Sequence, residues 1–295
     1  MSREIKTINI DTSLVVSSRN ITVDDSIRSI DVNQTDGTIL VTYPQGSDGS
    51  YDGSVIVYPQ SSALQVNYGV EIQDLGSFGS LNYPNDAKFN YLRRKIWICD
   101  SGNHRILKLN RDTQEVDISI EDEMYYPYSL VVNFNDGSVF VRGYSDIGRF
   151  KSVIMKFNSN GDTMGTFEFD TDSTDESSSS DSSSSSSSNP DVSSSSSSSS
   201  NDVFPILPLV NTIVYDHVRS KLWWTNKRQI YMANERNKSL QIYNVDDDAY
   251  FNTYAIDVEL SSGNAFVVVG DNHDERFLIQ MYRDNSLLLG TAFIA

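Results

Sequence analysis

A short run of alternating apolar and polar residues occurs five times along the chain. Each run ends in a polar residue, and the five read SIDVN to Asn33, DAKFN to Asn90, SLVVN to Asn133, TIVYD to Asp216 and AIDVE to Glu259. Their ends are about 57, 43, 83 and 43 residues apart, near the roughly 40–50-residue period of several repeat folds once one insertion is set aside. Because alternation of period two is typical of half-buried strands, the pattern predicts a repeated β structure.

Three further strand-like runs follow each of these segments. In the third block they are SVFVRGY, SVIMKFN and TMGTFEF, and Asn135-Asp136-Gly137 and Asn160-Gly161 stand where tight hairpins need residues that tolerate positive φ. No window of similar length shows the helical period of 3.6 residues. Four strands per block is the pattern of a propeller blade, so we predict an all-β chain folded as a β-propeller, with blades 1–3 in residues 26–171 and blades 4–5 in residues 203–295.

Residues 1–25 contain at most two strand-like runs, EIKTINI and SLVVSSRNITV. They form either an N-terminal extension that attaches the propeller to something else, or part of a degenerate sixth blade. The fifth block supplies four strands of its own and does not need the N-terminus to complete it. The pattern therefore favours five blades, with six as the alternative.

Residues 172–202 have a different composition from the rest of the chain. They are dominated by serine, carry several acids and no base, and include no aromatic residue and a single valine. Such a segment cannot bury enough apolar surface to offset its ordering entropy, so we predict a disordered tether inserted between blades 3 and 4. An inert spacer is the favoured role; phosphorylation or glycosylation of the serines is the alternative.

Charge and cysteine content narrow the functional classes. The 23 basic and 40 acidic residues give a net charge of −17, which repels the phosphate backbone of nucleic acids, so we expect no nucleic-acid partner. The single cysteine, Cys99, excludes an internal disulfide and a thiolate metal cluster. The sequence shows no signal-peptide h-region and no apolar run long enough to span a membrane. We therefore expect a protein that does not insert into membranes and is either cytoplasmic or assembled into a virion.

Two of the blocks resemble known propeller repeats. The second block, KIWICDSGNHRILKLN, resembles the NHL repeat, whose second and third strands are joined by an Asp-Ser-Gly-Asn-x-Arg turn, here Asp100 to Arg105. The fourth block, KLWWTNKRQIYMAN, looks like the related YWTD repeat, with Trp224, Thr225 and Asn226 at the Trp-Thr-Asp positions. The resemblance covers roughly residues 24–295 and implies a propeller; both families usually have six blades.

One rim of such a propeller should collect the loops that enter each first strand and those that join second and third strands. On this chain these loops carry aromatic residues, two histidines and several arginines, a composition suited to binding a protein or glycan. The candidate ligand-binding residues are Tyr51, His104, Arg105, Tyr125, Tyr126, Tyr128, Arg149, Asn272 and His273.

Some of these residues have a structural alternative. Arg105 is expected to pair with a carboxylate such as Asp100 across its turn. An aromatic residue that precedes a first strand, such as Tyr83, can serve only to pack one blade against the next. Three tyrosines within Tyr125–Tyr128 cannot all point into one core, so for these residues a binding role and a packing role both remain open.

Catalysis is the less favoured alternative. No serine or cysteine stands in a recognisable nucleophile motif beside a histidine, and Cys99 lies in an apolar strand where an inert thiol is expected. The gluconolactonase family, similar in architecture, holds a divalent metal in its channel with Glu, Asn and Asp. The residues that end the five first strands offer oxygen ligands of this kind: Asn33, Asn90, Asn133, Asp216 and Glu259.

Three functions are consistent with these observations. The first is a non-catalytic module that binds a protein or glycan through the tyrosine-rich rim, without a cofactor. The second is a structural component of a virion or other particle, attached by the N-terminal strands and spaced by the serine tether. The third is a metal-dependent hydrolase or lyase with a divalent cation in the channel.

Overall fold

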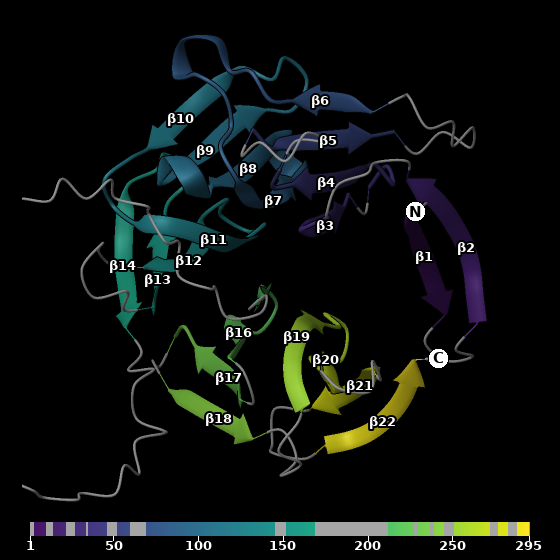
Figure 1. The fold of residues 1–295 in the computed structure, drawn as a ribbon. Coiled ribbons are helices and arrows are strands. Elements are labelled where there is room, and N and C mark those ends of the chain that lie inside the picture. Colours follow the sequence, from purple (N-terminus) through teal and green to yellow (C-terminus); the bar gives the residue numbers. More distant parts are fainter. Residues whose placement is uncertain are drawn as a thin grey trace, which may run out of the picture.

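The computed structural model describes residues 3–9, 14–21, 27–33, 35–45, 52–59, 69–144, 152–168, 212–226, 229–236, 239–244, 251–271, 277–282 and 288–294. Within these residues the chain forms five four-stranded antiparallel sheets and one two-stranded sheet. Figure 1 shows the sheets arranged as blades around a central axis. The prediction of an all-β propeller with five four-stranded blades is therefore confirmed. No helix in these residues is long and apolar enough to cross a membrane.

The strands follow one another along the chain blade by blade. Blade 1 contains β3 (Ser29–Val32), β4 (Ile39–Tyr43), β5 (Ser54–Tyr58) and β6 (Val70–Ile72). Blade 2 contains β7 (Pro84–Asn90), β8 (Lys95–Asp100), β9 (Arg105–Asn110) and β10 (Val116–Ile120). Blade 3 contains β11 (Tyr125–Val132), β12 (Val139–Tyr144), β13 (Ser152–Phe157) and β14 (Thr163–Glu168).

The last two blades repeat this order. Blade 4 contains β15 (Ile213–Asp216), β16 (Lys221–Asn226), β17 (Gln229–Asn234) and β18 (Leu240–Asn244). Blade 5 contains β19 (Phe251–Val258), β20 (Ala265–Asp271), β21 (Phe277–Tyr282) and β22 (Leu288–Ile294). Short 3₁₀ helices occur at η1 (Gly76–Phe78), η2 (Tyr91–Arg93) and η3 (Ser101–Asn103). The serine-rich segment 172–202 lies outside the described residues.

Local turn chemistry explains how the first two strands of a blade pair. In blade 3 the side chain of Asn133 accepts the backbone N–H of Asn135 at 3.1 Å, and the N–H of Gly137 donates to the Asn133 carbonyl at 2.8 Å. Gly137 has φ of 78°, a conformation that glycine adopts without a steric cost. Blade 1 uses the same arrangement at Asn33 and Gly37. The polar residue that ends the first strand is thus part of the hairpin turn.

Buried apolar side chains fill the space between consecutive blades. Trp97 of β8 packs in the core shared by blades 2 and 3, and Trp223 of β16 in the core shared by blades 4 and 5, both with no exposed area. Phe140 of β12, equally buried, belongs to the core between blades 3 and 4. Because alternate residues of a strand face opposite neighbours, blades 2, 3 and 4 each contribute to the core on both sides.

The sector between blade 5 and blade 1, which we call the seam, is built differently. It holds only β1 (Arg3–Asn9) and β2 (Leu14–Ile21), an antiparallel hairpin (Figure 1). On the seam side of β3, Ile30 and Val32 are 39% and 49% exposed, whereas the equivalent Ala87 and Phe89 of β7 are each 1% exposed. The N-terminal strands therefore occupy the place of a sixth blade with half the usual number of strands and leave the adjoining face of β3 less covered.

Candidate functional site

Hydrogen bonds between first strands link consecutive blades around the channel. In each of blades 1 to 4, a polar side chain in the first strand or directly before it accepts a backbone N–H from the first strand of the next blade. The bonds run from Ala87 N to Ser29 Oγ (3.4 Å), Leu130 N to Asp86 Oδ2 (2.9 Å), Ile213 N to Ser129 Oγ (3.3 Å) and Ile256 N to Thr212 Oγ1 (2.9 Å). Blade 5 has Ala255 at this position, which offers no side-chain acceptor across the seam. The series of bonds is therefore interrupted at the seam.

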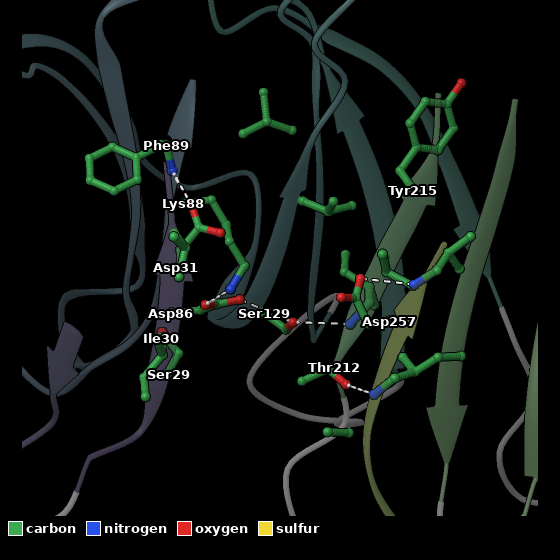
Figure 2. A pocket seen from close by; sticks show the side chains of 18 of the residues that line it. Ser29, Ile30, Asp31, Asp86, Lys88, Phe89, Ser129, Thr212, Tyr215 and Asp257 are labelled. Atoms are coloured by element: carbon green, nitrogen blue, oxygen red, sulfur yellow. Dashed lines mark hydrogen bonds and ion pairs between the residues drawn. The ribbon is translucent and has the colours of Figure 1, made fainter. Parts of the chain in front are cut away.

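The five first strands enclose a central cavity of about 640 Å³. Two residues further along each first strand, side chains from all five blades line it: Asp31, Lys88, Val131, Val214 and Asp257. Figure 2 shows Asp31, Lys88 and Asp86 on one wall of the cavity and Asp257 on the facing wall. The charged residues come from blades 5, 1 and 2, and the valines from blades 3 and 4. The cavity thus combines charged lining residues from three blades with apolar lining residues from the two others.

Asp86 and Lys88 form the charged pair of this cavity. Lys88 Nζ lies 2.9 Å from Asp86 Oδ1. The other carboxylate oxygen of Asp86 accepts the Leu130 N–H and, at 3.2 Å, the Ser129 hydroxyl. Although burial opposes its charge, the carboxylates of Asp86 and Asp31 hold the pKa of Lys88 above its ordinary value. Asp86 therefore joins blades 2 and 3 and also balances the lysine.

Asp31 and Asp257, unlike Asp86, form no ion pair with a described residue. Asp31 Oδ2 accepts the Phe89 N–H at 2.8 Å, and Asp257 Oδ1 accepts the Val258 N–H at 2.8 Å. The backbone of Val32 is a further hydrogen-bond donor to Asp31. Burial raises the pKa of Asp31 above its ordinary value, even though Lys88 and the Phe89 N–H act in the opposite direction. Desolvation likewise raises the pKa of Asp257 above its ordinary value.

The raised pKa of Asp31 predicts a pH-dependent stability. Between its unfolded-state and folded-state pKa values this carboxyl binds more protons in the folded protein, so its contribution to the free energy of unfolding falls as the pH rises through that interval. In Asp31→Asn, whose amide oxygen can still accept the Phe89 N–H, this decline should be absent. Urea unfolding of both proteins from about pH 4 to about pH 7 measures the difference, and a wild type that gained on the variant with rising pH would contradict the assignment.

Aromatic residues surround both mouths of the cavity. On the predicted rim side the lining includes Tyr128, Tyr144 and Tyr254, together with Arg28, whose Nε donates to Asn85 Oδ1 at 3.0 Å. At the opposite mouth the lining residues are Tyr91, Phe134, His217 and Leu260. The ring centroids of Tyr91 and Phe134 lie 4.4 Å apart, and that of His217 lies 5.8 Å from Phe134.

The rim itself carries an aromatic cluster that consists of Tyr83, His104, Tyr125 and Tyr126. The His104 and Tyr125 ring centroids are 4.1 Å apart, those of His104 and Tyr126 6.3 Å, and those of Tyr83 and Tyr126 6.4 Å. Tyr126 is buried and the other three are half-buried. Burial lowers the pKa of His104 below its ordinary value, so its imidazole is neutral at physiological pH. Burial also raises the pKa of Tyr126 to about 12.

Three members of this cluster have a left-handed backbone conformation. Tyr83, His104 and Tyr126 have φ of 48°, 54° and 50°. Positive φ is uncommon for residues other than glycine, especially bulky ones, and the strain persists only where the surroundings impose it. The other described non-glycine residues with positive φ are not aromatic: Arg94, Gln114, Asp122 and Ser220.

The Asp100–Arg105 turn imposes the position of His104. Asp100 is fully buried and accepts hydrogen bonds from Asn82 N (2.7 Å), Asn103 Nδ2 (2.9 Å) and Arg105 Nε (2.7 Å). Ser101 donates through Oγ to the carbonyl of Pro127 in blade 3. The expected pairing of Arg105 with Asp100 is therefore present. Arg105 is 7% exposed and acts in positioning this turn.

Glycine is required inside the same turn because of a close approach. The N–H of Gly102 donates to the Asn82 carbonyl at 2.8 Å, and a Cβ atom at residue 102 would lie 2.6 Å from the Asn82 side chain. The turn is thus fastened to the loop before β7 as well as to blade 3. Each invariant position of the predicted NHL-type motif has a contact that explains it.

The three tyrosines of Tyr125–Tyr128 do not form one surface. Tyr125 stacks on His104, and Tyr126 turns inward. Tyr128 is among the residues that line the cavity, and its hydroxyl lies 3.1 Å from Ser152 Oγ of β13, with the Arg142 guanidinium of β12 5.4 Å above its ring. Four other predicted rim residues lie outside the described residues: Tyr51, Arg149, Asn272 and His273.

The five proposed metal ligands do not line the cavity. Asn33, Asn133 and Asp216 use a side-chain oxygen to accept backbone N–H groups of their own hairpin turns. Asn90 is buried, and Glu259 is exposed and accepts a hydrogen bond from Ser262. Among the residues that the structure describes, no three His, Cys, Asp or Glu side chains are arranged to hold a metal ion. A divalent cation held by this set stays a prediction without geometric support.

A catalytic thiol is likewise not favoured by the geometry. Cys99 has no exposed area, and burial raises its pKa well above the ordinary value. A thiolate is therefore scarce and inaccessible at this position.

The cavity residues Asp31, Lys88 and Asp257 were not identified from the sequence. A signal was present, because they are the middle residues of SIDVN, DAKFN and AIDVE, and the same position in the two other runs is valine. Comparing that position across the repeats would have predicted charges facing the channel.

The fold and the two sites define the class of this protein as a β-propeller with a partly charged central cavity and an aromatic cluster on one rim. The sequence matches no protein-family model and none of the curated proteins. Among solved structures, the chain is similar to one from a nidogen/laminin complex, with a TM-score of 0.63, 14% identity, and coverage of 98% of this chain and 88% of that one. It is also similar to a chain of Kuenenia stuttgartiensis hydrazine synthase, with a TM-score of 0.58, 11% identity, and coverage of 94% and 70%. At these identities the likeness concerns the fold.

Proposed function

We propose that this protein is a non-catalytic interaction module whose rim binds a protein partner through the aromatic cluster at the junction of blades 2 and 3. The observation that carries the proposal is the convergence of Tyr83, His104 and Tyr126, all with left-handed backbone conformations, in one cluster. Such strain occurs preferentially at binding and switch sites, where a fixed side-chain arrangement has a use.

The supporting geometry is rigid. The turn that holds His104 is fastened by the buried Asp100–Arg105 pair and by Ser101, so the cluster is organised before a partner arrives. Pre-organised aromatic side chains lose little conformational entropy on binding, and tyrosine is enriched at the energetic centres of interfaces. One of the fold neighbours comes from a complex between nidogen and laminin, which agrees with a protein-binding role for this architecture.

The test is a pair of single substitutions, His104→Ala and Tyr125→Ala. If Tyr125 is an interface hot spot, its truncation should weaken partner binding by about 30-fold, the factor that corresponds to about 2 kcal/mol. Partners would be identified by affinity capture with quantitative mass spectrometry, and dissociation constants would then be measured for the partner recovered with the wild type.

Two controls distinguish loss of binding from loss of structure. Tyr125→Phe keeps the ring that stacks on His104 and should retain most of the affinity. Val218→Ala removes an exposed side chain, 56% accessible, from the turn after β15 at the opposite end of the channel and should have no effect. A partner that binds all four variants alike, with their folds intact, would place the interface elsewhere.

Further experiments address the finer alternatives. A glycan partner would be recovered on a glycan array and not by protein capture, with the same dependence on Tyr125. The Asp100–Arg105 turn and the Trp224–Asn226 segment support assignment of the repeats to the NHL and YWTD types. Mass spectrometry of particles purified from the source would establish whether the partner belongs to a virion.

A further inference from the structure

We propose that the central cavity binds a small organic cation, with a primary ammonium group at Asp31 and Asp257 and an apolar body against Val131 and Val214. This proposal goes beyond the rim function and does not depend on it. The cavity, about 640 Å³, falls within the roughly 300–1,000 Å³ range of small-molecule sites.

The charge distribution determines the kind of ligand. Three carboxylates and two cationic side chains line the cavity, and Asp86 is already matched by Lys88 at 2.9 Å. Arg28 lies at the rim-side mouth, where it donates to Asn85. Asp31 and Asp257 therefore remain as the carboxylates that form no ion pair with a described residue, although the charge of Lys88 acts on both at longer range.

The available hydrogen-bond acceptors favour an ammonium group that donates. Asp31 accepts backbone N–H groups of Phe89 and Val32, and Asp257 accepts that of Val258. A carboxylate has about four acceptor positions, so both keep capacity for a further donor. A bound ammonium group would favour the ionised forms of both carboxyl groups, whose pKa values desolvation raises. The overall charge of −17 also attracts cations toward the channel.

The apolar lining residues of the cavity, and the rings at its mouths, suit an apolar ligand body. Val131 and Val214 face the cavity from blades 3 and 4, and aromatic rings at the two mouths, including Tyr128 and Phe134, provide further apolar contacts. An aromatic face near a cation adds an attraction of its own. A ligand with one charged end and one apolar end matches this division of the cavity.

The experiment compares n-hexylammonium with 1-hexanol, which has a similar length and one donor but no charge. In calorimetric titrations at low salt, hexylammonium should bind the wild type at least tenfold more tightly than hexanol. In Asp31→Asn/Asp257→Asn the affinity for hexylammonium should fall at least tenfold, toward that of hexanol. Asp112→Asn, which removes one exposed negative charge outside the cavity, should leave both affinities unchanged.

A second measurement does not depend on the variants. In the wild-type protein, hexylammonium should shift the amide NMR signals of Phe89 and Val258, whose N–H groups donate to the two carboxylates, and leave those of Arg94 and Asp112 unshifted. Equal affinity for the two probes, absence of binding, or shifts confined to residues outside the cavity would each overturn the proposal. If the rim variants kept full partner binding, the proposed rim function would be wrong, but the proposal for the cavity would stand.

Discussion

Replacing Asp86 by alanine should lower the free energy of unfolding by about 3–5 kcal/mol, the typical effect of removing one partner from a buried ion pair. Asp86 is 4% exposed and receives hydrogen bonds from Lys88, Ser129 and the Leu130 N–H. The substitution leaves a cationic lysine without its nearest carboxylate and removes the acceptor that ties blade 2 to blade 3. Urea unfolding followed by tryptophan fluorescence measures the change, because Trp97 lies in the core between these blades.

Two related variants indicate the source of the effect. Asp86→Asn keeps an acceptor for the Leu130 N–H but loses the charge opposite Lys88, so its loss should be intermediate. Asp112→Ala breaks an ion pair with Arg94 that is open to solvent and should have little effect. If Asp86→Ala unfolds at the same urea concentration as Asp112→Ala, the role assigned to Asp86 is wrong.

The second large effect is expected at Asp100. Asp100→Ala should also cost about 3–5 kcal/mol of unfolding free energy, since it leaves Arg105, itself 7% exposed, as a buried charge without its carboxylate. It also removes the acceptor used by Asn82 and Asn103, which orders the turn beneath His104. Partner binding at the rim should therefore weaken in this variant even under conditions where it is fully folded.

A double-mutant cycle with Arg105→Ala tests the pair directly. The double variant should lose less stability than the two single variants added together, with a coupling of about 1–3 kcal/mol, because the second substitution removes the charge that the first one stranded. Unfolding midpoints of the four proteins give the coupling. Additive losses would mean that the two side chains act independently.

The sequence predicted the architecture well because the fold depends on a pattern that many residues share. Alternation in the first strands occurred five times, once for each blade, and turn sequences such as Asn135-Asp136-Gly137 marked where hairpins lie. The ion pair inside the Asp100–Arg105 turn was also predictable, since its two residues are five positions apart in the sequence. The cavity was harder to predict, because its charges are single residues in strands from blades 1, 2 and 5 and come together only when the ring closes.

The tyrosines of β11 show a different limit. Their three directions result from an irregularity in the pairing of β11 with β12 between Tyr125 and Ser129, and from the left-handed conformation of Tyr126. No residue type in YYPY marks such a conformation, because it is imposed by contacts with Tyr83 and His104, which lie far away in the sequence. Their proximity in the sequence therefore suggested one binding surface, whereas the backbone directs the three side chains to different places.

The seam has a consequence for how the molecule is assembled. β1 and β2 precede all five blades in the sequence, yet they lie in the ring beside blade 5, the last of the blades (Figure 1). Ring closure therefore depends on contacts between strands that are more than 200 residues apart in the sequence, and it is expected to be slow. Ala255 offers no side-chain acceptor at the seam, so other contacts of the β1–β2 hairpin must close the ring. The β1–β2 hairpin and blade 5 thus meet at the seam, the junction at which the series of hydrogen bonds between first strands is interrupted.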